Sequence, residues 1–203
     1  MPDPSWWLAI PGAIQATYAL IKAAHEGKQP EDQHVKEAER LLHLLEEMRD
    51  ALNWVQSTEA LPPFFDKTIA PLGRVCASSR RLMHEPPSQI ENDGLSAIDY
   101  WFMADGALAA LIGQVHDIEL PMISVSGEDM RGRSWRIKVS NLQSEVNQSL
   151  IDADNNNAHL SQSHIADMDL LKRLIETMLN AIDSQRSKRY NQLVTALSSL
   201  PRP

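Results

Sequence analysis

The chain has 203 residues, which is enough for one domain with a sizeable core. Hydrophobic residues make up 43% of it and charged residues 23%, ordinary globular values that exclude extensive disorder. The formal net charge of −8 argues against nonspecific nucleic-acid binding by the whole molecule. The lone cysteine, Cys76, cannot form an internal disulfide, so we expect a small core residue in a reducing compartment.

The first predicted element is an apolar helix that starts near Pro4 or Pro11 and ends at Gly27. Its central part, residues 5–24, carries one charged residue and a face of small residues at helical spacing. The chain start lacks the positive region of a secretory signal, and polar residues interrupt the only stretch that could span a bilayer. The sequence therefore predicts a cytoplasmic protein.

A second helix is predicted over residues 31–57. Its apolar residues follow spacings of 3, 4, 3, 4, 3, which indicates a stripe that faces one packed partner. These residues are Ala38, Leu41, Leu45, Met48, Leu52 and Val55.

Three further helices can be placed by the same periodicity. One starts at Pro62-Pro63, is kinked or divided by Pro71, and ends before a polar loop that runs to Gly94. The next, over residues 95–117, is apolar on most sides and is predicted to be the most buried element. The last starts near Ser163, and its apolar pattern is broken over residues 183–189 and resumes to residue 200.

Residues 122–139 allow two interpretations. Alternating residues on both sides of two glycines are typical of a hairpin. A helical stripe that starts at Trp135 and continues to about Ala153 competes with the second strand, and we favour this helix because more positions keep its period.

The predicted fold class is all-α, an antiparallel bundle of about six helices with a small β-hairpin around 122–139 as an option. We expect one domain over residues 1–203. Within it, the apolar helix of residues 1–27 could detach, and residues 120–139 form an irregular or hairpin insertion.

An adjacent His116-Asp117 pair at a helix end resembles the metal-binding dipeptide of HD-domain phosphohydrolases. In such all-α enzymes an upstream histidine and a downstream aspartate complete the site, which here implies His84 and either Asp167 or Asp169 as further metal ligands. The sequence departs from that family directly after the pair, and a polar helix end is the competing interpretation. We therefore assign no catalytic residue, no metal and no cofactor, and keep the phosphohydrolase as an alternative.

A basic cluster with an interleaved tryptophan is a candidate contact surface for a partner or an anionic membrane. It consists of Arg131, Arg133, Trp135, Arg136 and Lys138.

The bulky residues of the opening helix form a second candidate contact surface. They are Trp6, Trp7, Ile10, Ile14 and Tyr18.

Together these features favour a non-catalytic protein that acts by association with a protein partner or with itself. The alternative is a membrane-perturbing bundle, cell-death or toxin-like, that releases its apolar first helix. An apolar first helix at the extreme N-terminus of a bundle is similar in architecture to fungal HeLo domains. No small-molecule substrate can be identified.

Overall fold

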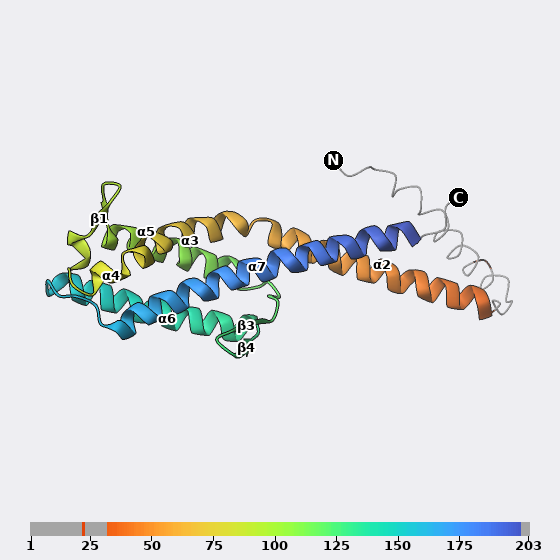
Figure 1. The fold of residues 1–203 in the computed structure, drawn as a ribbon. Helices are drawn as coiled ribbons and strands as arrows, with labels where there is room; N and C mark the ends of the chain where they lie inside the picture. The colour runs from red at the N-terminus through yellow and green to blue at the C-terminus, as the bar shows by residue number, and fades with distance from the viewer. Residues whose placement is uncertain (1–21, 23–31, 200–203) are drawn as a thin grey trace. The chain divides into compact units, whose positions relative to one another are not determined.

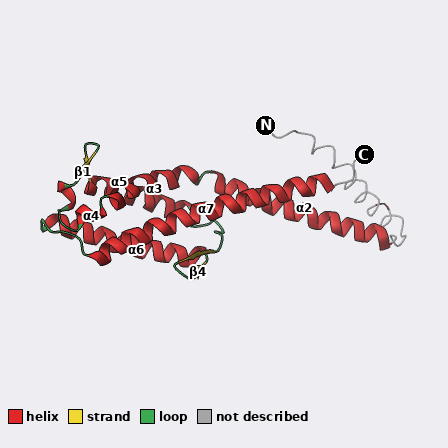
Figure 2. Cartoon of the chain, in the orientation of Figure 1, coloured by secondary structure: helices red, strands yellow, loops and turns green. Residues whose placement is uncertain are grey.

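The computed structural model describes residue 22 and residues 32–199, and the chain divides into two compact units. Unit 1 contains the described residues up to Gln56 and those from Arg186 onward, and unit 2 runs from Ser57 to Gln185. The described residues form an all-α bundle of six helices with two short antiparallel sheets, as the sequence predicts (Figures 1 and 2). The single domain over residues 1–203 stays a prediction.

Unit 2 is a four-helix bundle with short additional elements. Its long helices are α3 (Pro62–Ala77), α5 (Ala97–Gln114), α6 (Gly132–Asn155) and the first part of α7 (Gln162–Ser199). The short elements are α4 (Ser79–Leu82), the 3₁₀ helix η2 (Pro87–Gln89) and the strands β1 (Glu91–Asn92), β2 (Leu95–Ser96), β3 (Ile123–Val125) and β4 (Glu128–Met130).

Hydrogen bonds between helices show that α5 and α6 of unit 2 run antiparallel. Along α5 and α6, the indole N–H of Trp101 donates to Asn147, and the Gln143 amide donates to Asp105. As the residue number rises on α5 it falls on α6, which is the pattern of an antiparallel pair. The indole N–H of Trp135 joins α6 to the Leu174 carbonyl of α7 at 3.0 Å.

The α3 helix continues through Pro71, so the prediction that this proline divides the helix is wrong. Pro71 is buried together with Leu72 and Val75, and α3 packs against α5 along its length. Burial of this face offsets the backbone hydrogen bond that proline cannot make. The helix ends at Ala77, and the Ser78 hydroxyl donates to the Arg74 carbonyl.

Two hairpins flank α5, each with a two-residue turn. The turn residues are Asp93-Gly94 in one and Ser126-Gly127 in the other, all with positive φ. Positive φ at both residues is the requirement of a type I′ turn, which matches the twist of the strands. The first hairpin replaces part of the loop that the sequence predicts, so α5 begins at Ala97 and not at Leu95.

Around residues 122–139 both interpretations hold in part. The hairpin exists, but its second strand is Glu128–Met130, and α6 has already begun at Gly132. The strand alternative for Trp135–Val139 is therefore wrong, and the helix that we favour there is confirmed. At α7 the residues 183–189 interrupt the apolar pattern without ending the helix.

The described part of unit 1 contains α2 (Asp32–Glu59) up to Gln56 and α7 from Arg186. The helix predicted over 31–57 is confirmed, but its apolar stripe is only partly covered. Ala51 and Trp54 are buried, whereas Leu45 and Leu52 of the predicted stripe are 48% and 47% exposed. The guanidinium of Arg189 lies 5.2 Å from the centre of the Trp54 ring, so α7 covers a side of α2 that is rotated away from these leucines.

Candidate functional site

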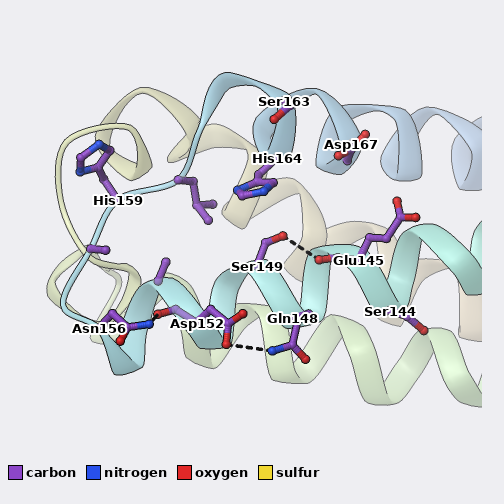
Figure 3. A pocket seen from close by; sticks show the side chains of 13 residues that line it. Ser144, Glu145, Gln148, Ser149, Asp152, Asn156, His159, Ser163, His164 and Asp167 are labelled. Atoms are coloured by element: carbon purple, nitrogen blue, oxygen red, sulfur yellow. Dashed lines mark hydrogen bonds between the residues drawn. The ribbon is translucent and has the colours of Figure 1, made fainter.

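A groove of about 770 Å³ lies in unit 2 between the C-terminal half of α6 and the start of α7 (Figure 3). Most of the residues that line it have polar side chains, among them His159 in the loop between the two helices and His164 and Asp167 on α7. The full lining is Ser144, Glu145, Gln148, Ser149, Asp152, Ala153, Asn156, Ala158, His159, Leu160, Ser163, His164 and Asp167.

The polar side chains of this groove bond mainly to their own helix. The Ser149 hydroxyl donates to the Glu145 carbonyl at 2.7 Å, and the Gln148 amide donates to the Asp152 carboxylate at 2.8 Å. The Nδ1 atom of His164 is buried without a hydrogen-bond partner in the structure. Because its hydroxyl proton is directed to a backbone carbonyl, Ser149 lacks the adjacent base that an activated nucleophile needs.

The four residues of the phosphohydrolase alternative do not form one cluster. His84 follows α4 and lies at the end of unit 2 where α5 begins. The Asn92 amide, just before α5, donates to the Ser78 hydroxyl, just before α4, and the Leu160 N–H donates to the Leu82 carbonyl at the same end. His116 and Asp117 follow the other end of α5, whose 18 residues span about 27 Å.

The His116–Asp117 pair is instead a local surface contact. Their side chains bond to each other at 3.0 Å and are 76% and 97% exposed. Asp167 lies in the α6–α7 groove. Within the described part of the chain, no three His, Cys, Asp or Glu side chains are grouped so that they could hold a metal ion.

The basic cluster does not present its tryptophan to solvent. Trp135 is fully buried, and its indole N–H bonds α7, so it cannot stack on a partner. Arg136 donates to the Val115 carbonyl at 2.9 Å, and Lys138 forms an ion pair with Glu128. Only Arg131 and Arg133 remain exposed, and we therefore remove Trp135 from the predicted contact surface.

The contact residues predicted in the opening helix, from Trp6 to Tyr18, lie outside the described residues. The membrane alternative depends on them and stays a prediction. Among the described residues, no helix has the length and apolar character needed to cross a bilayer.

Sequence reasoning missed the one large apolar surface on the described part of α5. Phe102 and Met103 are 51% and 54% exposed. Four small residues that follow them at helical spacing are also exposed. We call this set the α5 face: Phe102, Met103, Gly106, Ala109, Ala110 and Gly113. The prediction that α5 is the most buried element is therefore only partly right, because a helix that is apolar all round does not reveal which side is covered.

The α5 face is both uncharged and low in relief at its C-terminal end. A Cβ atom built on Gly106 or Gly113 would meet no atom of the described chain within 4 Å, so both glycines border open space. One exposed carboxylate, Asp99, borders this face one helical turn before Phe102 and Met103, whereas Asp105 at its side is half-buried and accepts a hydrogen bond from Gln143. Such a surface allows another backbone to approach closely.

Cys76 is less buried than the core position that the sequence predicts for it. Its thiol is partly buried and lies 3.8 Å from the Met168 carbonyl oxygen, between α3 and α7. Burial, together with the neighbouring Asp169 carboxylate, raises the pKa of the thiol to about 12. A thiol in this state is unreactive at neutral pH.

Comparison with known proteins yields no relative for this chain: no family model, no curated protein and no solved structure matches it.

Proposed function

We propose that this protein is a non-catalytic association module that pairs with a second copy of itself through the α5 face. The observation that carries the proposal is an exposed, uncharged and apolar surface on a helix that is otherwise packed against α3 and α6. Full burial of a phenylalanine or methionine side chain contributes about 1.5–3 kcal/mol. Covering the exposed halves of Phe102 and Met103 would therefore contribute roughly 2 kcal/mol in total.

The shape of the face favours a second copy as the occupant. Its bulky residues, Phe102 and Met103, stand at the N-terminal end, and its small residues Ala109, Ala110 and Gly113 stand at the other end. In a two-fold symmetric pair each residue i that meets residue j is matched by j meeting i. An antiparallel α5 pair therefore places Met103 of each copy over Gly113 of the other.

The size of the face predicts a weak dimer. From Phe102 to Gly113 the helix is about 17 Å long, and a helix is about 10 Å wide. The area buried falls below the roughly 800 Å² per partner of a standard stable interface. We therefore expect reversible association that depends on protein concentration.

Sedimentation equilibrium on matched variants tests this proposal. Ala110→Glu places a charge in the α5 face, and Ala70→Glu makes the same change at an exposed position in the middle of α3. The proposal predicts a concentration-dependent rise in mass for the wild type and for Ala70→Glu, and none for Ala110→Glu. Equal masses for all three proteins at every concentration would contradict it.

A further inference from the structure

Charged side chains border the α5 face at both of its ends. Asp99 lies one helical turn before the bulky end of the face, and its carboxylate is exposed. His116 and Asp117 lie three and four residues after Gly113, and their side chains are 76% and 97% exposed. Residues at these spacings lie on one side of a helix. The turn after α5 continues the helix here, since the His116 N–H donates to the Gly113 carbonyl.

The antiparallel α5 pair proposed above brings these charged groups together. The register that places residue 103 of one copy over residue 113 of the other also places residue 99 over residue 117. Asp99 of one copy then faces Asp117 of the other at each end of the pair, with His116 beside them. Within one chain the His116 Nδ1 atom lies 3.0 Å from an Asp117 carboxylate oxygen. At each end one imidazole thus lies beside two carboxylates.

We propose that these groups make self-association through the α5 face tighter as the pH falls from about 8 to about 6. The inference rests on the proposed function, because Asp99 and His116 meet only if two α5 faces pair. While His116 is neutral, Asp99 and Asp117 repel each other across the pair and oppose association. Once His116 is protonated, it attracts Asp99 of the other copy in addition to Asp117 of its own chain.

The direction of the effect follows from proton linkage. A proton binds His116 more tightly in the pair than in the single chain, because the pair adds a second carboxylate next to the ring. The state that binds protons more tightly is favoured as the pH falls. Pairing therefore strengthens on the acid side and weakens on the alkaline side of the range in which histidine changes charge, about pH 5 to 8.

The other charged groups around His116 in the same chain keep their charge over this range. They are the carboxylates of Asp117 and Glu119, which are in the same loop, and the guanidinium of Arg136 on α6. Arg136 donates to the carbonyl of Val115, the residue before the histidine, at 2.9 Å. Carboxylates stay ionised and guanidinium groups stay protonated near neutral pH. The imidazole is therefore the group whose charge changes at this end of α5.

Asp99, the group of the other copy that faces His116, also stays ionised. The Ser96 hydroxyl and backbone N–H donate to its carboxylate at 2.6 Å and 2.9 Å and hold its pKa below the ordinary value of 3.8. An exposed ion pair changes an equilibrium constant by roughly 1.5- to 5-fold. Two-fold symmetry supplies two such pairs, so we expect the dimer to be about fivefold tighter at pH 6 than at pH 8.

Sedimentation equilibrium of the full chain at about pH 6 and about pH 8, in low salt where charges are least screened, tests the inference. His116→Gln removes the titrating group. His43→Gln is the matched control, because the side chain of His43 on α2 is also 76% exposed and lies 3.5 Å from a Glu47 carboxylate oxygen. The wild type and His43→Gln should both dimerise about fivefold more tightly at pH 6, whereas His116→Gln should change by less than about twofold.

A second variant tests the repulsion between the facing carboxylates. Asp117→Asn removes one of the two, so its dimer should be at least about twofold tighter than that of the wild type at pH 8. Asp129→Asn removes the same charge at an exposed position of β4 and should leave the affinity unchanged. Equal affinities of the wild type and Asp117→Asn at pH 8 would count against the inference.

Failure of this inference can be told apart from failure of the α5 pairing. If the wild type associates, Ala110→Glu does not, and the wild type and His116→Gln respond equally to pH, the pairing stands and the inference is overturned. If no protein associates at either pH, or if Ala110→Glu associates like the wild type, the pairing itself is contradicted and the inference fails with it.

Discussion

The indole N–H of Trp135 donates to the carbonyl oxygen of Leu174 at 3.0 Å, with the whole Trp135 side chain buried between α6 and α7. This bond satisfies a backbone carbonyl in the core of unit 2 and fixes the ring inside the bundle. It also explains why arginines on both sides of Trp135 in the sequence do not make a stacking surface.

Replacing this tryptophan should destabilise unit 2. Trp135→Phe removes the N–H, leaves the Leu174 carbonyl without that partner, and opens a space in the core. Together the lost hydrogen bond and the cavity should lower the free energy of unfolding by about 2–4 kcal/mol. Urea denaturation followed by circular dichroism measures this change. A loss under about 0.5 kcal/mol, as expected for an ordinary surface substitution, would contradict the role given to the ring.

The capping box of α5 should make stability depend on pH in the acid range. The Ser96 hydroxyl and backbone N–H both donate to the Asp99 carboxylate and hold its pKa below the ordinary value of 3.8. Since the pKa is lower in the folded state, the stabilisation is present above pH 3.8 and is lost as the pH falls through the lower folded pKa.

Asp99→Asn should therefore flatten the decrease in stability on the acid side, which denaturation at a series of pH values below 5 would measure. Asp129→Asn, at an exposed carboxylate of β4, serves as the control. Identical acid profiles for the wild type and Asp99→Asn would count against the capping box.

The β3–β4 turn offers a stabilising substitution. Ser126 adopts φ 56°, a left-handed conformation that serine disfavours, next to Gly127 at φ 82°. Ser126→Asn or Ser126→Gly should raise the unfolding free energy by roughly 0.5–1 kcal/mol, whereas Gly127→Ala should lower it by about 1 kcal/mol. Thermal denaturation of the three variants checks the pattern, and a gain in Gly127→Ala would refute it.

Cys76 should react slowly with thiol reagents in the folded protein. Its pKa of about 12 leaves on the order of a thousandth of the thiolate that a thiol with the ordinary value of 9.0 has at pH 8. Labelling by iodoacetamide should accelerate by at least about two orders of magnitude on unfolding in urea. Similar rates in the folded and unfolded chain would show that the thiol is neither buried nor held protonated.

Periodicity was sufficient to predict the helices but not the way in which they pack. The stripe of α2 identified an apolar side correctly, yet α7 packs beside Trp54, so Leu45 and Leu52 remain exposed. In α5 the absence of charge from Gly106 onward hid the difference between a covered and an open side. Neighbours in the sequence cannot reveal such features, because they depend on partners far along the chain.

Turn chemistry was the other source of error. Asp93-Gly94 is a strong signal for a type I′ turn, but the flanking strands have only two residues each, too few for an alternating pattern. The predicted metal ligands do not form a site because they lie too far apart in the fold. His84 and His116 precede and follow a helix about 27 Å long, a separation that a short motif cannot report.

Mixed disulfide formation across the α5 face tests the central claim most directly. Two single-cysteine chains in a Cys76→Ala background, Met103→Cys and Gly113→Cys, are oxidised separately and as a mixture. Antiparallel pairing brings residue 103 of one copy over residue 113 of the other and leaves the two copies of residue 103 about 15 Å apart along the helices. The account predicts that the mixture forms disulfide-linked heterodimers much faster than either chain forms homodimers. Homodimers that form as fast as heterodimers, or no covalent dimers at any protein concentration, would contradict it.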